Sequence, residues 1–569
     1  MRWKIVPPEP AAEKLVGELG CHPVVARILW NRGLQDPAAA ESFLAARLRD
    51  LPDPSSLAGV DAAVRRLARA LVEDEPITVH GDYDVDGVSA TALLVSFLRA
   101  CGARRVDYVV PHRLRDGYGL AVETVRALAA RGTRLLVTLD CGVTAVAEID
   151  EAAAHGVDVI VVDHHQTSAD LPRAVAILNP WQPGCRYPTR ELAAVGVTFL
   201  LCAALRRFLR ERGWFEQRRE PDLREWLDFV ALGTIADVVP LVGANRLLVR
   251  AGLRRLTEAT RPGIRALKRA AGMEPDAEVS AAQVAFRLAP RINAVGRLDD
   301  ARVAVELLLA DDAGHAESLA RRLDAANAER QSIERELLEQ AVVQAEQQTG
   351  RAVVVAGEGW HPGVVGIVAA RLVERYRRPA VVIGLDPETG VGRGSGRSIG
   401  DFDLYAALRR CASFLEGYGG HRQAAGLTIA REAVPAFAEA FSRVAEESFD
   451  PAAAEPVCVV ESVLRPTDID EALCEAIAAL GPFGAGNPEP VLALLGAAVR
   501  GRVVGAGGVD GGGHLKLQID DAPLVDAIGF GMGHRLADLP RRVDLAFTLS
   551  IDTYGGLRRP QLRLRAIRA

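Results

Sequence analysis

The chain has 569 residues, 49% of them hydrophobic and 25% charged, so it is too long for one hydrophobic core and should form roughly three or four domains. Its net charge of -6 excludes binding of nucleic acid through an overall positive charge, although a local basic surface stays open. The sequence has no stretch of about 20 uncharged apolar residues, and MRWKIVPPEP lacks the apolar core of a signal peptide, so we expect a cytoplasmic protein. Its eight cysteines form no C-x-x-C pair, which disfavours zinc.

After an N-terminal segment (1–70), short apolar runs alternate with segments of helical periodicity. The runs ITVHG, RVDYVVP, RLLVTLD and VDVIVVD predict strands, and segments such as GVSATALLVSFLRACG predict helices. Strands that are apolar throughout and alternate with helices indicate a mainly parallel sheet covered on both faces. We therefore predict a first α/β domain over 71–240.

Acidic residues and histidines follow three of these strands. HGDYDVDG (80–87) follows the first strand, Asp140 the third, and Asp163, His164 and His165 the fourth. Because ligands bind outside the carboxyl ends of parallel strands, we expect these side chains to converge. HGDYDVDG alone could also be a solvated turn rich in Asp. A calcium-binding EF-hand is disfavoured, because that loop needs a glutamate where this chain has Leu93.

Carboxylates gathered in one cleft repel one another unless a cation neutralises them, so the cluster predicts a metal site, to which Asp237 in LGTIADVVPL adds a further acid. Carboxylate and imidazole ligands without thiolate favour Mn²⁺ or Mg²⁺. The ligands suffice for two ions, the arrangement used for in-line displacement at phosphorus. We expect Asp163 to orient its neighbours, His164 to bind metal and His165 to face the substrate.

The rest of the chain predicts three further regions. A helical region (241–345) ends in a run without Gly or Pro (316–348), which predicts a long helix spanning two domains. A second α/β domain (346–450) contains GRGSGRS, predicted as a glycine-rich loop whose backbone N–H groups, with Arg393, Ser395, Arg397 and Ser398, could bind an anion, although it lacks P-loop spacing. The tail (451–569) has short alternating runs that predict an OB-like β-barrel.

Four segments, HGDYDVDG, VTLDCGV, VVDHH and GTIADVVPL, resemble in order the motifs of the DHH phosphoesterase superfamily. GWHPGVVGIVAARL, GSGRSI and GGHRQAAG resemble the DHH-associated domain. PRINAVGRLDD and GPFGAGNPEP, followed by a barrel, resemble the superfamily's single-strand-specific 5′→3′ DNA exonucleases of repair and recombination. The resemblance covers the whole chain and implies hydrolysis of phosphodiester bonds by a metal-activated water, without a covalent intermediate.

The resemblance also implies roles for individual residues. It places one metal on His80, Asp84 and Asp140, and a second on Asp86, Asp140, His164 and Asp237, with Asp140 bridging. It places Asp82 and Asp163 behind these ligands, and it names Asp84, Asp86, Asp140, His164 and His165 as catalytic. For the 5′ phosphate and DNA it implies Ser395, Arg397, Arg113, Arg291, Arg297, His361 and His421. Arg113 and Arg115 also follow the second strand, where they could clamp a phosphate or simply belong to a surface loop.

Alternatives within the superfamily stay open. Phosphodiesterases of dinucleotides or short RNA, and manganese pyrophosphatases, share the metal motifs. A non-catalytic relative is disfavoured by the intact ligand set. Residues 534–569 contain eight Arg against three Asp, which suits binding of single-stranded DNA, and Tyr554 could stack on a base. By resemblance we expect a monomer that meets single-stranded DNA and either a single-strand-binding protein or a helicase.

Overall fold

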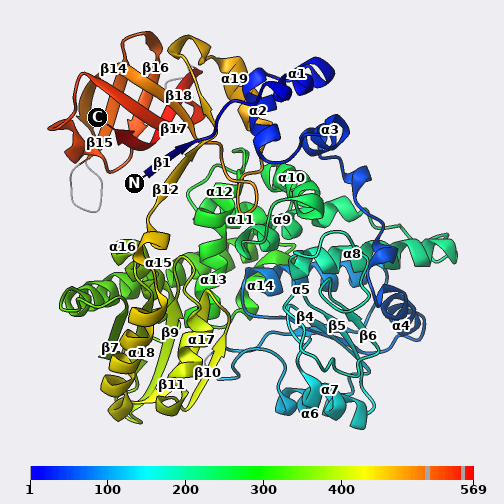
Figure 1. Cartoon of the computed structure of the whole chain (residues 1–569). Helices are drawn as coiled ribbons and strands as arrows, with labels where there is room; N and C mark the ends of the chain where they lie inside the picture. Colours follow the sequence, from blue (N-terminus) through cyan, green and yellow to red (C-terminus); the bar gives the residue numbers. More distant parts are fainter. Residues whose placement is uncertain (1, 114, 506–512, 553–557, 569) are drawn as a thin grey trace. The chain divides into compact units, whose positions relative to one another are not determined.

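The computed structural model describes residues 2–113, 115–505, 513–552 and 558–568 (Figure 1), and Tyr554 lies outside them. Its contacts divide the chain into two compact units. The first unit consists of Met1–Val110, Tyr118–Ala289 and Val457–Ala569, and the second of Pro111–Gly117 and Pro290–Pro456. Among the described residues, the structure contains no helix with the length and apolar character needed to cross a membrane.

The first unit contains the predicted parallel sheet, with strand order β3-β2-β4-β5-β6. Its strands are β2 (Ile77–His80), β3 (Val106–Val109), β4 (Leu135–Leu139), β5 (Asp158–Val162) and β6 (Ala176–Leu178). Four flanking helices follow these strands: α5 (Val85–Ala100), α6 (Val122–Ala130), α7 (Val146–Ala154) and α8 (Ala194–Glu211). The strand order changes direction between the neighbours β2 and β4, and parallel sheets bind ligands at such a point.

The first unit has further helices, some before the strands of this sheet in the sequence and others after them. They are α1 (Glu13–Leu19), α2 (Pro23–Asn31), α3 (Pro37–Ala45), α4 (Val60–Val72), α9 (Leu227–Ala236), α10 (Gly243–Glu258), α11 (Pro262–Ala270) and α12 (Ala281–Gln283). The buried Arg246 of α10 joins distant parts of the chain, since Nε donates to Phe43 O at 3.0 Å and Nη1 to Leu480 O at 2.9 Å. The N-terminal helices are therefore fixed to the rest of this unit.

The C-terminal part of the first unit is the predicted β-barrel. It is formed by β13 (Ser462–Val463), β14 (Leu492–Val504), β15 (His514–Ile519), β16 (Ala522–Gly529), β17 (Arg542–Asp552) and β18 (Arg559–Arg568), and α19 (Glu471–Ala478) precedes β14. The long β14 pairs with both β15 and β17, which closes the barrel. Before the barrel, β12 (Val457–Val460) pairs in parallel with β1 (Arg2–Ile5).

The second unit contains a mixed sheet with the order β10-β11-β9-β8-β7. Its strands are β7 (Val353–Glu358), β8 (Ala380–Leu385), β9 (Val391–Arg397), β10 (Gly417–Gly420) and β11 (Ala424–Ala430). Its helices are α14 (Arg302–Leu309), α15 (Ala313–Glu346), α16 (Val365–Tyr376), α17 (Leu404–Arg410) and α18 (Val434–Ser448), while α13 (Ala289–Leu298) leads into it. The predicted long helix is α15, and all of it lies in the second unit.

The prediction that GRGSGRS is a loop with free backbone N–H groups is wrong, because the segment up to Arg397 is strand β9 and its backbone pairs with β8 and β11. Each second residue is glycine for a packing reason. A Cβ on Gly394 would lie 2.8 Å from Leu427 Cδ1, and one on Gly396 would lie 3.0 Å from Leu404 Cδ2. Glycines with a period of two therefore mark the packed face of a strand, and the polar residues between them share its other face.

Candidate metal centre

The loop after β2 is shaped by its acidic residues. Asp84 caps α5, since its Oδ1 accepts hydrogen bonds from Asp86 N at 2.9 Å and Gly87 N at 3.1 Å. Asp86 is buried and holds the start of α8: Oδ2 accepts from Ala194 N at 2.6 Å and Oδ1 from Val195 N at 2.9 Å. These bonds fix the Asp86 carboxylate while α8 gains a partner for its first N–H groups.

The residues after β4 and β5 are positioned by their backbone and by one carboxylate. Asp140 has a φ of 63°, a left-handed conformation that aspartate tolerates better than most residues, and its N–H donates to Val162 O at 3.0 Å. Asp163 Oδ1 accepts from the backbone N–H groups of His164 at 2.7 Å and His165 at 3.1 Å, and from His165 Nδ1 at 2.8 Å. Asp163 therefore orients both histidines.

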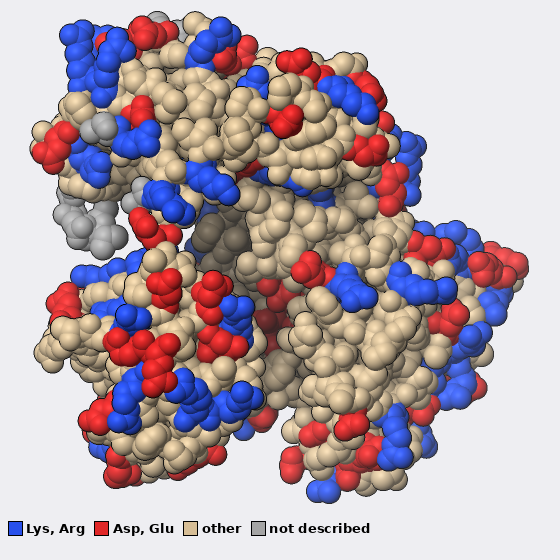
Figure 2. All heavy atoms as spheres, viewed as in Figure 1, with Lys and Arg blue, Asp and Glu red and all other residues tan. Residues whose placement is uncertain are grey.

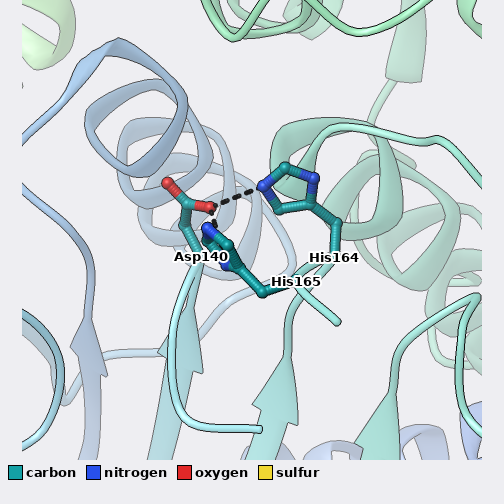
Figure 3. A group of neighbouring side chains, drawn as sticks. All are labelled: Asp140, His164 and His165. Carbon is teal, nitrogen blue, oxygen red and sulfur yellow. Dashed lines mark ion pairs between the residues drawn. The ribbon is translucent and has the colours of Figure 1, made fainter. Parts of the chain in front are cut away.

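Three groups of ligand atoms converge at this edge of the sheet, each with its atoms within 4.8 Å of one another. They are Asp82, Asp84 and Asp140; Asp86, His164 and Asp237; and Asp140, His164 and His165. Figure 3 shows the Asp140 carboxylate directed at both imidazole rings, with His164 Nε2 at 3.1 Å and His165 Nδ1 at 3.9 Å from Oδ1. Asp237 Oδ2 lies 3.6 Å from the other ring nitrogen of His164, so Asp140 and Asp237 flank one imidazole.

The buried charges change the protonation of these groups. Burial, followed by the charge of Asp84, raises the pKa of Asp86 to about 7, and burial followed by the charge of Asp86 raises the pKa of Asp237 to about 9. Burial and the neighbouring acids likewise raise the pKa of Asp140 well above its ordinary value. Burial lowers the pKa of His164 to about 4, which leaves a neutral ring with a lone pair for a metal ion.

His165 differs from His164 because it is paired with Asp163. Burial tends to lower the pKa of His165, but the hydrogen bond and the charge of Asp163 raise it to about 9. Burial tends to raise the pKa of Asp163, but the same pairing brings it down to about 2. The pairing with Asp163 therefore favours the imidazolium form of His165, whose side chain is 47% exposed and so suited to face an anion.

The residues present fit divalent cations. Asp140 Oδ1, His164 Nε2 and Asp237 Oδ2 are buried and have no hydrogen-bond partner among the described residues, although His164 Nε2 and Asp140 Oδ1 lie close together. Buried polar atoms normally have hydrogen-bond partners. These three atoms would therefore be satisfied by a cation, which can accept several lone pairs at once. Carboxylate oxygens with one neutral imidazole form a donor set suited to Mn²⁺ or Mg²⁺.

The structure places the other predicted ligand, His80, outside the three groups. It is buried at the end of β2, where its Nδ1 lies 3.7 Å from Cys141 Sγ. Asp82, expected behind the ligands, instead converges with Asp84 and Asp140. His80 is held in the sheet as a strand residue, whereas Asp82 lies in the loop after the strand and can reach the edge of the sheet. Gly87 makes this possible, because a Cβ on Gly87 would lie 2.6 Å from Asp82 N.

Sequence reasoning missed Tyr118, which lies at this centre. Its hydroxyl donates to Asp140 O at 3.1 Å and lies 3.3 Å from His165 Nδ1. The available signal was an aromatic residue between two glycines in the loop that follows the second predicted strand.

In the second unit, the predicted phosphate-binding residues divide into two sets. Arg397 Nη1 donates to Ser395 Oγ at 2.9 Å, and burial followed by the charge of Arg113 lowers the pKa of Arg397, so these three residues come together. Arg291 instead bonds Asp324 Oδ1 at 2.9 Å, and Arg297 bonds Gly363 O at 2.9 Å.

The predicted histidines of the second unit take structural bonds in turns. His361 Nδ1 accepts from Gly363 N at 3.1 Å, and burial lowers the pKa of His361. The exposed His421 accepts from Gln423 N at 3.3 Å. Arg115 is exposed in the segment that belongs to this unit, with its backbone N–H bonded to His112 O at 3.1 Å. The hydrogen bonds of His361 and His421 do not indicate a contact with substrate for either histidine.

Comparison with known proteins supplies the family. Family models match in three places: the DHH family N-terminal domain at 76–234, the DHHA1 domain at 349–447 and the RecJ OB domain at 460–566. The single-stranded-DNA-specific exonuclease RecJ of Dickeya dadantii is 40% identical over 95% of this chain and 95% of its own. The crystal structure of Thermus thermophilus RecJ in complex with Mn²⁺ matches 100% of this chain and 79% of its own, with a TM-score of 0.85 and 33% identity. Its complex with Mg²⁺ gives a TM-score of 0.79 and 32% identity, with coverage of 100% and 78%. The chain therefore belongs to the RecJ family of single-stranded-DNA-specific exonucleases.

Proposed function

We propose that this chain is a metal-dependent exonuclease that hydrolyses single-stranded DNA from the 5′ end. The observation that carries this proposal is the group of Asp86, Asp140, His164 and Asp237, in which Asp140 Oδ1, His164 Nε2 and Asp237 Oδ2 are buried without a hydrogen bond in the described part of the chain. The RecJ relatives, which this chain matches over nearly its whole length, are named for that substrate.

The side chains divide the work of the reaction. Asp82, Asp84 and Asp140 would hold one ion, and Asp86, His164 and Asp237 a second beside Asp140. Bound Mn²⁺ or Mg²⁺ would supply a nucleophilic water of lowered pKa and neutralise charge on the phosphate. Asp163 keeps His164 and His165 in position, and the imidazolium of His165 can donate a hydrogen bond to a phosphate oxygen.

The preference for the 5′ end, in this proposal, depends on a separate anion site in the second unit. Ser395 and Arg397 lie on the same face of β9, and Arg113 adds its charge to theirs. Two guanidinium groups and a hydroxyl suit a terminal phosphate, which has more charge and more oxygen acceptors than a phosphodiester. We propose that this site selects the 5′ end.

Arg397→Gln should lower kcat/KM on 5′-phosphorylated single strands by about 10- to 100-fold, the loss of one charge-assisted hydrogen bond. It should leave 5′-hydroxyl strands nearly unaffected. Arg410→Gln is the matched control, because Arg410 pairs with Glu447 on the exposed surface. An equal loss on both kinds of end would contradict a terminal-phosphate role for Arg397.

The barrel supports a strand substrate. Arg502 lies opposite Lys516 in the register of β14 and β15, although Lys516 also forms an ion pair with Asp526 at 2.8 Å. His514 contacts the exposed Phe530 edge to face, with ring centroids 5.2 Å apart. Basic and aromatic side chains together suit a single strand, which is bound through phosphates and stacked bases. Elsewhere on the visible face Lys and Arg are mixed with Asp and Glu (Figure 2), in keeping with the net charge of -6.

Location and partners belong to the same proposal. We propose action in the cytoplasm as a monomer, beside a single-strand-binding protein or a helicase that exposes the strand, in DNA repair and recombination.

The decisive experiment compares 5′-labelled and 3′-labelled single-stranded DNA, each alone and annealed to its complement, with Mn²⁺ or with EDTA. Metal-dependent release of the 5′ label from single strands, with slower loss from duplexes, is the expected result. Inert long DNA beside cleaved dinucleotides would move the assignment to a phosphodiesterase of small substrates.

A further inference from the structure

Tyr118 touches both sides of the metal centre through one atom. Its hydroxyl donates to the carbonyl oxygen of Asp140 at 3.1 Å, and the same oxygen lies 3.3 Å from Nδ1 of His165. Its ring meets the His165 ring edge to face, with centroids 5.9 Å apart, and the Tyr83 ring in the same manner at 6.5 Å. One side chain therefore contacts a ligand residue and the histidine expected to face the phosphate.

The bond to Asp140 secures a backbone that is otherwise strained. A left-handed conformation is unfavourable for a residue with a Cβ, and Asp140 adopts it with a φ of 63°. Its N–H is held by Val162 O at 3.0 Å and its carbonyl by Tyr118. Without the hydroxyl, the carbonyl of Asp140 would lose this hydrogen bond, and the direction of the carboxylate would be less firmly fixed.

The contact with His165 limits the rotation of its ring. Nδ1 is bonded to Asp163 Oδ1 at 2.8 Å, and the Tyr118 oxygen lies beside the same nitrogen as a second acceptor. The Tyr118 hydroxyl donates its own proton to Asp140 O, which leaves its oxygen lone pairs free to face His165 Nδ1. The two acceptors fix the imidazole plane.

The backbone around Tyr118 explains why a side-chain anchor is needed. Gly117 and Gly119 have φ values of 80° and 86°, and a Cβ on either would have no atom within 4 Å. Glycine is thus required there for conformation and not for packing. The chain turns on both sides of Tyr118, and the tyrosine side chain attaches this turn to the metal centre.

We propose that Tyr118 is a positioning residue that fixes the Asp140 peptide and the His165 ring, and so sets metal affinity and the rate of hydrolysis without binding the strand. The kinetic half of this inference rests on the nuclease function proposed above, whereas the metal-affinity half does not.

The test compares Tyr118→Phe with Tyr187→Phe. Tyr187 is buried, and its hydroxyl has no hydrogen-bond partner among the described residues, so the same substitution there should leave Mn²⁺ affinity, kcat and KM unchanged and should not lower the unfolding midpoint. For Tyr118→Phe we expect Mn²⁺ affinity, measured by electron paramagnetic resonance without DNA, to fall about 10-fold, and kcat to fall about 10- to 100-fold, as for other groups that orient metal ligands. KM for single-stranded DNA should stay unchanged, and the unfolding midpoint of the metal-free protein should fall only slightly, by the loss of one hydrogen bond.

Other results overturn the inference. Unchanged Mn²⁺ affinity and kcat would remove any role for the hydroxyl, and a raised KM with intact kcat would make Tyr118 a contact of the strand. A lowered midpoint of the metal-free protein with intact kcat would make its role structural. If the wild-type chain leaves single-stranded DNA intact while Tyr118→Phe still loses Mn²⁺ affinity, the nuclease proposal fails and the role of Tyr118 stands.

Discussion

Asp140→Asn should abolish metal-dependent degradation of single-stranded DNA and at the same time stabilise the metal-free protein. The loss should exceed about 100-fold, because even residues that only support metal ligands cost 10- to 100-fold when changed. Asn keeps the shape of the side chain and tolerates the left-handed backbone of this position, so the fold should be preserved. The gain in stability follows because one charge is removed from a cluster in which the neighbouring acids repel Asp140.

The measurement combines an exonuclease assay with thermal unfolding in EDTA and in Mn²⁺. Wild-type protein should gain about 2.7 kcal/mol at a Mn²⁺ concentration 100 times Kd, and Asp140→Asn should lose most of that gain. Asp170→Asn, in an exposed loop, is the control and should behave as wild type. A metal-free variant that unfolds below the wild-type temperature would refute the repulsion on which the metal prediction depends.

Gly233→Ala should damage both folding and catalysis although it adds one methyl group. A Cβ at this position of α9 would lie 2.7 Å from Asp86 Oδ1 and 2.7 Å from Val195 Cγ1. Such overpacking costs about 1–3 kcal/mol. The displaced carboxylate would also lose its bonds to the start of α8, and a shift of a ligand by about 1 Å can cost about 100-fold in rate.

Gly17→Ala is the matched control for Gly233→Ala. Gly17 lies inside α1, where a Cβ would have no neighbour within 4 Å. The same change there should stabilise the protein by about 0.5–1 kcal/mol, the helix preference of alanine over glycine. The test measures the free energy of unfolding of both variants in urea, together with their nuclease activity. If both variants gain stability, α9 is not packed on Asp86 as described.

The sequence predicts the sheet and the convergence of its acids because both follow from local periodicity. Strands that are apolar throughout can only be buried in a parallel sheet, and its carboxyl ends bring Asp140 and His164 to one edge whatever their separation along the chain. The three ligand groups confirm that convergence. The roles of the individual residues stay proposals.

The exact ligand set and the anion site were harder to predict. Whether His80 or Asp82 joins Asp84 depends on how the chain leaves β2 and on the space at Gly87, which no periodicity records. In GRGSGRS the glycine content is typical of a loop, whereas its period of two indicates a strand, and the packing of Gly394 on Leu427 decides between them. Tyr118 acts through one hydroxyl that lies beside a ligand 22 positions away.

The first unit consists of three separate stretches of chain, which affects how it folds during synthesis on the ribosome. The strand β1 is made first, yet its partner β12 is made only after the whole second unit, roughly 20 to 90 s later at about 5–20 residues per second. Arg246 likewise waits for Leu480. The second unit is nearly continuous in sequence and can therefore be complete while the first unit is unfinished. The first unit then still exposes an unpaired strand edge and apolar surface that is buried in the folded protein. A chain whose synthesis stops before Val457 would carry a finished insert inside an unfinished host, a species prone to aggregation.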